Sequence, residues 1–92
     1  MKPEVIHEKE NDRFIIYSEG KESFIEYRIN ADEMNLYHTY TDPGLRGKGL
    51  AAHVVRAAFE YAKENNLKVV PTCSYVQAFI KRNDEYSELI AE

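Results

Sequence analysis

The sequence DPGLRGKG, residues 42–49, decides how the rest of the chain is read. It separates a segment with the alternation of a β-strand, Met34–Thr41, from a segment with the period of an α-helix that begins at Leu50. Glycines let the backbone adopt positive φ and let a ligand approach closely. The first turn of a helix presents unpaired N–H groups and the positive end of the helix dipole, and Arg46 and Lys48 add two positive charges. The stretch therefore predicts an anion-binding loop that suits phosphate.

Four β-strands are predicted before this loop. Each is a short run of β-branched and aromatic residues, and the runs are separated by turn-forming residues at Asn11-Asp12, Glu19–Lys21 and Ala31–Glu33. The pair Asn11-Asp12 suits a two-residue hairpin turn, because both residues tolerate left-handed backbone geometry. An antiparallel meander is therefore expected from four segments: Val5–Glu10, Phe14–Tyr17, Ser23–Asn30 and Met34–Thr41.

Strict alternation divides the side chains of the fourth predicted strand between two faces. One face would carry Met34, Leu36, His38 and Tyr40. The opposite face would carry Asn35, Tyr37, Thr39 and Thr41.

After the loop, the pattern predicts a long helix and then a short strand. Apolar residues at intervals of four, such as Leu50, Val54 and Ala58, predict a helix from Leu50 to about Asn65. A helical crossover connects the fourth strand to the fifth, so the two are expected to be parallel. The remaining elements are a strand over Lys68–Pro71, a loop over Thr72–Tyr75, a helix over Tyr75–Lys81 and one or two helical turns over Asn83–Ile90.

Length and composition predict a single small domain spanning residues 1–92. A net charge of −4 argues against general nucleic-acid binding. No apolar run approaches the ~20 residues that cross a bilayer, and Met1–Glu4 does not open a signal peptide. One cysteine excludes an internal disulfide and fits a reducing compartment, so a cytoplasmic location is expected. The scattered histidines and single cysteine lack metal-ligand spacing, so no metal is expected.

Two other phosphate-binding loops share part of the glycine pattern. Gly44 and Gly49 have the spacing of a Walker A loop, but the two residues after Gly49 are not the required lysine and hydroxyl residue. A dinucleotide-binding pattern is formally present at Gly47, Gly49 and Ala52. The preceding strands look antiparallel, however, and the chain is too short for a doubly wound sheet. Both readings are excluded.

The sequence RGKGLA, residues 46–51, resembles the acyl-CoA loop of the GCN5-related N-acetyltransferases, whose pattern is [Q/R]-x-x-G-x-[G/A]. The segments YHTY, residues 37–40, and PTCSYV, residues 71–76, are similar to those of a minimal single-domain subfamily, the YjdJ-type acetyltransferase-like proteins. The resemblance covers roughly Glu26 to Ile90. The chain departs from the wider superfamily between the first two strands, where Asn11-Asp12 replaces the pair of helices that normally encloses the acceptor site.

This resemblance implies an α+β fold and acetyl-CoA as the acyl donor. The fold would have a mainly antiparallel twisted sheet of about five strands, a long helix after the fourth, and a parallel fourth and fifth pair splayed around the thioester. Loop amides would hold the CoA pyrophosphate, and a backbone N–H near Tyr40 or Thr41 would polarise the thioester carbonyl. The cofactor-binding residues implied are Tyr40, Thr41, Arg46, Gly47, Lys48, Gly49, Leu50 and Ala51.

Three side chains are candidates for the chemistry. Cys73 either accepts the acetyl group as a thiolate, forms a mixed disulfide with CoA, or only packs. His38 is a candidate base, because the fourth strand should neighbour the fifth, and otherwise a core or edge residue. Tyr75 either protonates the departing CoA thiolate or covers the pantetheine arm.

The sequence therefore predicts an acetyl-CoA-dependent N-acetyltransferase that acts on an unidentified amine, such as a protein lysine, a polyamine or a small amine. The alternative is a CoA or acetyl-CoA binder that acts as a regulator or adaptor without robust transfer. The loop supports both functions, and the absent acceptor helices favour the second. The chain is expected to be a monomer or weak dimer with no nucleic-acid or membrane partner.

Overall fold

The computed structural model describes residues 3–91, and a five-stranded sheet lies at its centre. The strands stand in sequence order; the first four are antiparallel to their neighbours, and the fifth is parallel to the fourth. This arrangement confirms the predicted α+β architecture. The strands are β1 (Ile6–Glu8), β2 (Arg13–Ser18), β3 (Lys21–Asn30), β4 (Glu33–Thr41) and β5 (Lys68–Val70).

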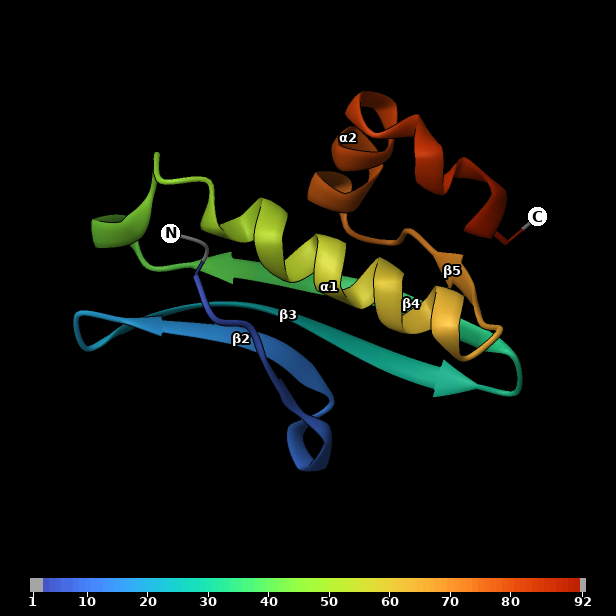
Figure 1. The fold of residues 1–92 in the computed structure, drawn as a ribbon, viewed down its shortest axis with the longest axis horizontal. Helices are drawn as coiled ribbons and strands as arrows, with labels where there is room; N and C mark the ends of the chain where they lie inside the picture. The colour runs from blue at the N-terminus through green and yellow to red at the C-terminus, as the bar shows by residue number, and fades with distance from the viewer. Residues whose placement is uncertain (1–2, 92) are drawn as a thin grey trace.

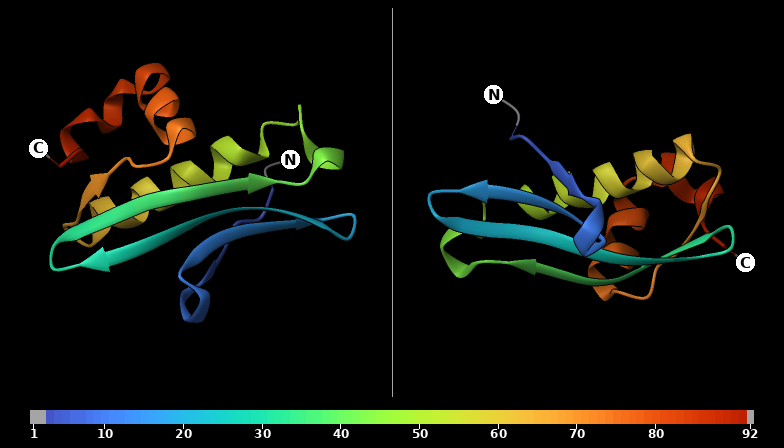
Figure 2. Two further views of the ribbon diagram at one scale, coloured as in Figure 1. Left: turned by 180° about the vertical axis from the view of Figure 1, so that it is seen from behind. Right: turned by 90° about the horizontal axis from the view of Figure 1, so that it is seen from below.

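Helices cover one face of the sheet, called the helix face below (Figures 1 and 2). The long helix α1 (Leu50–Glu64) crosses this face, as expected, and α2 (Ser74–Arg82) and the 3₁₀ helix η3 (Asp84–Leu89) follow β5. Two shorter 3₁₀ turns, η1 (Lys9–Asn11) and η2 (Pro43–Leu45), stand in loops. Within residues 3–91, no α-helix covers the opposite face, called the outer face below. None of the helices in this range is long and apolar enough to cross a membrane.

The core lies between α1 and the sheet. Phe59 of α1 has no exposed surface, and its ring stacks on Phe79 of α2 and Tyr86 of η3, with centroid distances of 5.7 Å and 5.1 Å. Stacked aromatic rings bury large areas and add a small geometric preference. The C-terminal elements are therefore fixed to α1 by this aromatic cluster.

The connection between β1 and β2 differs from the predicted two-residue turn at Asn11-Asp12. The chain forms η1 over Lys9–Asn11, and Asp12 takes a left-handed φ of 50°. β1 is therefore shorter than the predicted strand, because its last residues enter the turn. The Asp12 carbonyl accepts a hydrogen bond of 3.0 Å from the amide of Tyr27, which draws the connection toward β3.

A β-bulge changes the pattern of faces along β4. Glu26 pairs with His38 and Tyr27 pairs with Leu36, so Tyr37 is an extra residue without a partner in β3. Beyond the bulge, Thr39 pairs with the buried Ile25. The predicted alternation is therefore wrong past Leu36. Thr39 and Thr41 join Met34 and Leu36 on the helix face, whereas His38 and Tyr40 lie on the outer face.

The outer face buries one aliphatic side chain without help from a helix. Ile15 is completely buried, although it lies on this face beside Phe24. The Tyr17 hydroxyl donates to one carboxylate oxygen of Glu8 at 2.6 Å, and Arg13 Nε donates to the other at 2.7 Å. The Arg13 guanidinium also lies 5.2 Å from the centre of the Phe24 ring. These polar side chains keep water away from Ile15.

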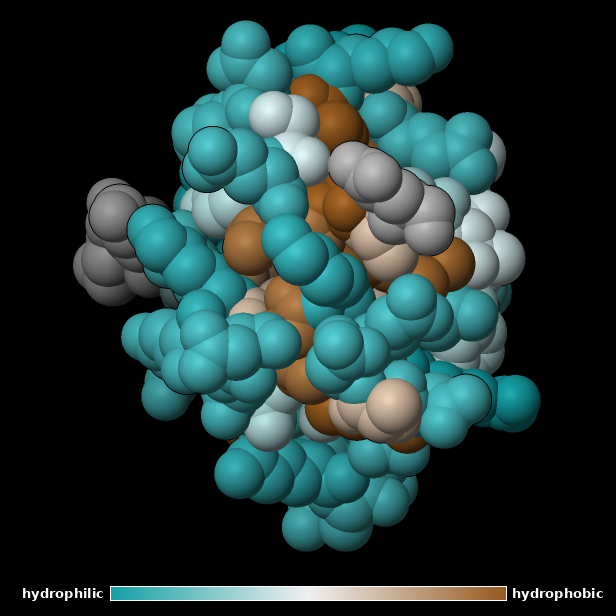
Figure 3. Space-filling model, turned by 90° about the vertical axis from the view of Figure 1, so that its right-hand side faces the viewer, coloured by the Kyte–Doolittle hydropathy of each residue, from teal (hydrophilic) through white to brown (hydrophobic). Residues whose placement is uncertain are grey.

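Figure 3 shows the end of the molecule where β5 and the C-terminal residues lie, and hydrophobic side chains gather there between hydrophilic borders. One cross-strand row runs through Ile29, Met34, Val69 and Ile90. Met34 and Val69 are buried, whereas Ile29 is 45% exposed. The amide of Ala91 donates to the Val69 carbonyl at 2.8 Å, so the chain beyond η3 pairs with β5.

His7 of β1 packs on the helix face among aromatic rings. It stacks on Phe14 with a centroid distance of 4.0 Å, meets Tyr61 of α1 edge-on, and its Nε2 is hydrogen-bonded to the Tyr27 hydroxyl. Burial first, and the charge of Lys9 second, lower the pKa of His7. Burial also raises the pKa of Tyr27 to about 12, which keeps its phenol protonated and able to donate.

This cluster predicts a loss of stability in mild acid. The pKa of His7 is about 6.5 in the unfolded chain and lower in the folded protein, so the unfolded chain binds the proton first as the pH falls. The stabilisation is complete above about pH 6.5 and is lost as the pH falls through the folded-state pKa. Urea unfolding followed by circular dichroism measures the free energy of unfolding from about pH 7.5 to about pH 5. We expect this free energy to fall less steeply, as the pH is lowered, in His7→Gln than in the wild type. Equal slopes would contradict this prediction.

Candidate functional site

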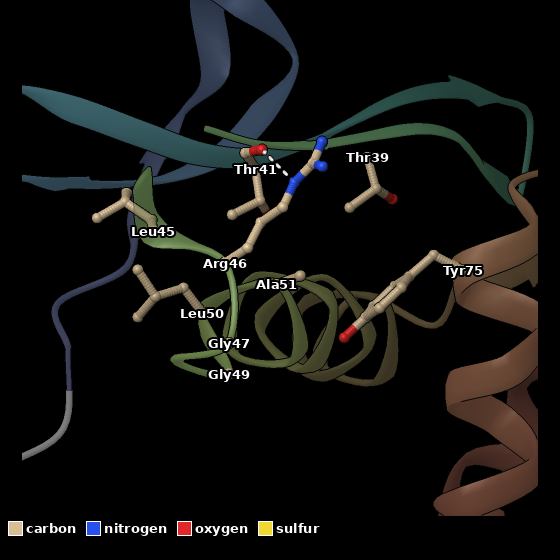
Figure 4. Close-up of a pocket in the computed structure, with 9 residues that line it drawn as sticks. All are labelled: Thr39, Thr41, Leu45, Arg46, Gly47, Gly49, Leu50, Ala51 and Tyr75. Carbon is tan, nitrogen blue, oxygen red and sulfur yellow. Dashed lines mark hydrogen bonds between the residues drawn. The ribbon is translucent and has the colours of Figure 1, made fainter. Parts of the chain in front are cut away.

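A cavity of about 360 Å³ opens between the C-terminal end of β4, the start of α1 and the start of α2 (Figure 4). Strand, loop and both helices each contribute to its walls. The lining residues are Thr39, Thr41, Leu45, Arg46, Gly47, Gly49, Leu50, Ala51 and Tyr75.

The loop between β4 and α1 is shaped by a capped turn and two left-handed glycines. The Asp42 carboxylate accepts a hydrogen bond of 3.0 Å from the Gly44 amide, and the buried Leu45 anchors the turn. Gly47 and Gly49 have φ of 85° and 74°, a region that side chains rarely adopt. No other group lies within 4 Å of a Cβ placed at either glycine, so their requirement is conformational rather than steric.

The N-terminus of α1 faces this cavity without a side-chain cap. Gly49 stands at the N-cap position and offers no capping oxygen, and the first turn contains no acidic residue. The first four N–H groups of a helix lack partners within the helix. Leu50 and Ala51, which carry two of these groups, line the cavity. The arrangement therefore suits an anion.

The two loop cations point in different directions. Arg46 extends into the cavity between Thr41 and Thr39, and its Nε donates to the Thr41 carbonyl at 3.3 Å (Figure 4). Lys48 does not line the cavity; its Nζ lies 3.3 Å from a carboxylate oxygen of Glu19.

The cavity brings together most of the residues expected to bind cofactor. Tyr40 is the other exception besides Lys48: it lies on the outer face, 37% exposed, beside Phe24. Those that line the cavity are Thr41, Arg46, Gly47, Gly49, Leu50 and Ala51.

Tyr75 forms the wall of the cavity opposite the loop. Its ring extends from the first turn of α2 toward α1 (Figure 4). Burial raises the pKa of Tyr75, and the charge of Arg82 opposes this only in part. The phenol is therefore protonated at neutral pH and able to donate a proton.

Cys73 lies beside the cavity lining, immediately before α2. Its amide donates to the Leu36 carbonyl at 3.0 Å, which joins β4 to the segment after β5. Its Sγ lies 3.3 Å from the Thr39 hydroxyl. Burial acts to raise the pKa of Cys73, but the Thr39 hydroxyl, together with the nearby backbone amides of Tyr75 and Val76, outweighs it and lowers the pKa. The thiol therefore has increased thiolate character.

His38 does not meet Cys73. The bulge turns it to the outer face, where it is exposed and its ring meets Phe24 with a centroid distance of 6.0 Å. Thr39 takes the position beside the thiol instead. A role for His38 as the base stays a prediction, and it would require the amine to approach from the outer face.

Thr39 and Leu45 line the cavity but were missed in the sequence. An apolar residue inside a loop of glycine, proline and charge was a usable signal for Leu45 as an anchor. No signal marked Thr39, since its position depends on the extra residue at Tyr37. Among residues 3–91, no group of three or more His, Cys, Asp or Glu side chains is placed to hold a metal ion.

Comparison with known proteins places this geometry in a family. A family model described as GCN5-related N-acetyl-transferase matches residues 13–89. An NMR structure of a GCN5-like protein from Staphylococcus aureus superposes with a TM-score of 0.70 at 26% identity, covering 96% of this chain and 87% of that chain.

Vertebrate relatives named Protein NATD1 share part of the sequence. The zebrafish (Danio rerio) protein is 32% identical over 83 residues, covering 86% of this chain and 74% of the relative. The human protein is 38% identical over 50 residues, covering 54% of this chain and 44% of the relative. The frog (Xenopus tropicalis) protein is 34% identical over 55 residues, which is 50% of its length. The chain thus spans about half the length of the human and frog relatives.

The surroundings of Cys73 predict that Thr39 lowers the pKa of its thiol. Because the Thr39 hydroxyl lowers the pKa of the thiol, Thr39→Val should raise that pKa and slow alkylation by iodoacetamide at pH 7. Mass spectrometry over a pH series gives the midpoint for each protein. Thr41→Val is the matched control, since Thr41 bonds to Ser23 rather than to the thiol. A midpoint unchanged by Thr39→Val would contradict the assignment.

Proposed function

This chain belongs to the GCN5-related N-acetyltransferase family, and on that premise we propose that it binds acetyl-CoA beside α1 and transfers the acetyl group to an amine. One observation carries the proposal. The uncapped N-terminus of α1, the left-handed glycines and the Arg46 side chain all meet in one cavity at the end of β4.

The negative pyrophosphate of CoA is assigned to the loop. Its oxygens would accept hydrogen bonds from the free amides at the start of α1, where the helix dipole favours negative charge. Arg46 would exchange its bond to the neutral Thr41 carbonyl for a charge-assisted bond to phosphate. The pantetheine arm would then run along Thr39 and Thr41, with Tyr75 on its other side.

Transfer to the amine is proposed as a direct attack on the thioester carbonyl. The amine lone pair forms the new C–N bond as the C–S bond breaks, and the amine gives up one proton to water. The CoA thiolate takes a proton from Tyr75, whose raised pKa keeps the phenol protonated until that moment. The phenolate is then reprotonated by solvent.

A second route would pass through Cys73. Its thiolate would attack the thioester and release CoA, and the acetyl group would then move from the cysteine sulfur to the amine. The lowered pKa of the thiol and its place next to Thr39 support this route. The two routes differ in whether an acetylated protein accumulates without an amine.

The alternative function is a CoA or acetyl-CoA binder without robust transfer. One observation favours it: only the three-residue η1 stands between β1 and β2, so that connection supplies no α-helix to enclose an acceptor. Binding of CoA without release from acetyl-CoA would support this alternative.

We predict that Arg46→Glu weakens CoA binding at least about tenfold, because it replaces a charge-assisted hydrogen bond with repulsion. Isothermal titration calorimetry measures the affinity, and the shift in melting temperature with CoA provides a second readout. Lys63→Glu, at the other end of α1, makes the same change in charge and should retain wild-type affinity. Failure of CoA to bind or stabilise the wild type would refute the proposed function.

We also predict that the protein releases CoA from acetyl-CoA when an amine is present. Intact mass and free thiol are recorded with and without a mixture of polyamines and lysine peptides. An acetyl adduct on Cys73 that disappears on adding amine supports the cysteine route. Turnover retained in Cys73→Ala supports direct attack. Tyr75→Phe should lower the rate at saturating acetyl-CoA, because it removes the proton donor.

A further inference from the structure

The hairpin that joins β2 to β3 reaches the loop between β4 and α1 and carries an acidic residue at its tip. Glu19 and Gly20 have φ of 55° and 74°, and β3 begins at the next residue, Lys21. Positive φ at both central residues is typical of a type I′ turn, the tight connection that matches the twist of the strands. Glu19 is therefore presented from a short, well-defined turn rather than from a loose loop.

Besides the ion pair between Glu19 and Lys48, two contacts hold this hairpin against the loop. The amide of Asp42 donates to the Glu22 carbonyl at 3.0 Å. The Lys21 side chain lies across Gly44, so closely that a Cβ at Gly44 would come within 2.8 Å of its Cε. The tip of the hairpin thus forms a second wall of the loop, on the side away from α1.

The contact between Glu19 and Lys48 is the one that involves a loop cation. The two charged atoms are 3.3 Å apart, and their side chains are 64% and 49% exposed. An exposed ion pair of this kind contributes little to stability, so either charged group can readily change partner. A phosphate group bound at the loop would compete with the Glu19 carboxylate for the same ammonium group.

We infer that Glu19 is a positioning residue that keeps Lys48 outside the cavity until a phosphate ligand binds. This inference rests on the proposed CoA site. Binding would transfer Lys48 from the carboxylate to the pyrophosphate, so each binding event breaks one ion pair to form another. Glu19 thereby lowers the affinity for CoA and for acetyl-CoA to the same extent, because both carry the same pyrophosphate.

The test is a double-mutant cycle on CoA affinity. Calorimetry is carried out with wild type, Glu19→Gln, Lys48→Met and the double variant. Glu19→Gln should tighten CoA binding by about two- to fivefold, the range expected from an exposed ion pair. In the Lys48→Met background the same change should have a much smaller effect, since no ammonium group remains to be released. The gain should also shrink at high salt.

Two matched variants separate positioning from a general effect of charge or fold. Glu22→Gln removes the same charge from the same hairpin but from the outer face, opposite Tyr17, and should leave the affinity unchanged. Glu19→Asp keeps the carboxylate and should bind close to wild type. Melting temperatures without CoA show whether Glu19→Gln is folded like the wild type.

Three outcomes would overturn the inference. Unchanged or weaker CoA binding in Glu19→Gln, with normal binding by the wild type, removes Glu19 from the site while leaving the proposed function intact. If Glu19→Gln tightens CoA binding equally in the Lys48→Met background, the gain arises from repulsion between Glu19 and phosphate and not from Lys48. No CoA binding by the wild type refutes the proposed function, and this inference with it.

Discussion

The extra residue in β4 is the constraint on which the rest of the site depends. Tyr37 has no partner in β3, and the strand therefore reverses its faces at this point. Without it, Thr39 and Thr41 would lie on the outer face, and the cavity would lose two of its lining residues. The thiol of Cys73 would also lose the hydroxyl that lowers its pKa. One inserted residue thus brings Thr39 and Thr41 into the lining of the cavity and places the Thr39 hydroxyl against the Cys73 thiol.

The loop between β4 and α1 supplies the second half of the site, because the helix start that follows it has no side-chain cap. Helix starts are usually capped by a side-chain oxygen. Here a left-handed glycine occupies the N-cap of α1, and the first turn carries no acidic residue. The first amides of α1 therefore lack a capping side chain, which makes the start of the helix less stable than a capped one unless an anion binds there. Arg46 and Lys48 likewise contact groups of the protein itself: Arg46 donates to the Thr41 carbonyl, and Lys48 lies beside the Glu19 carboxylate. Under the proposed function, a phosphate would replace both partners.

The sequence predicted the elements and the loop because those depend on local signals. Helical period, turn residues and glycine spacing located α1, the hairpins and most of the cavity lining. Alternation failed at His38 because a bulge leaves no trace in the pattern of apolar residues. The predicted two-residue turn at Asn11-Asp12 was wrong because the chain enters a 3₁₀ turn at Lys9, and Asp12 pairs with Tyr27 of β3, a residue distant in the sequence. The sequence near Lys48 does not indicate its partner, because Glu19 belongs to the distant hairpin between β2 and β3.

Within residues 3–91, no α-helix covers the outer face, so this face of the sheet meets water directly. A sheet with helices on one side must keep its other side compatible with water. The bonds among Glu8, Arg13 and Tyr17 do so by burying Ile15 beneath polar groups. The outer face therefore needs no α-helix over it for Ile15 to be buried, and the short η1 connection between β1 and β2 supplies none. The same bulge sends His38 to this face. An amine arriving there would meet the histidine on one face of β4, whereas the cavity proposed to hold the acyl donor lies on the other.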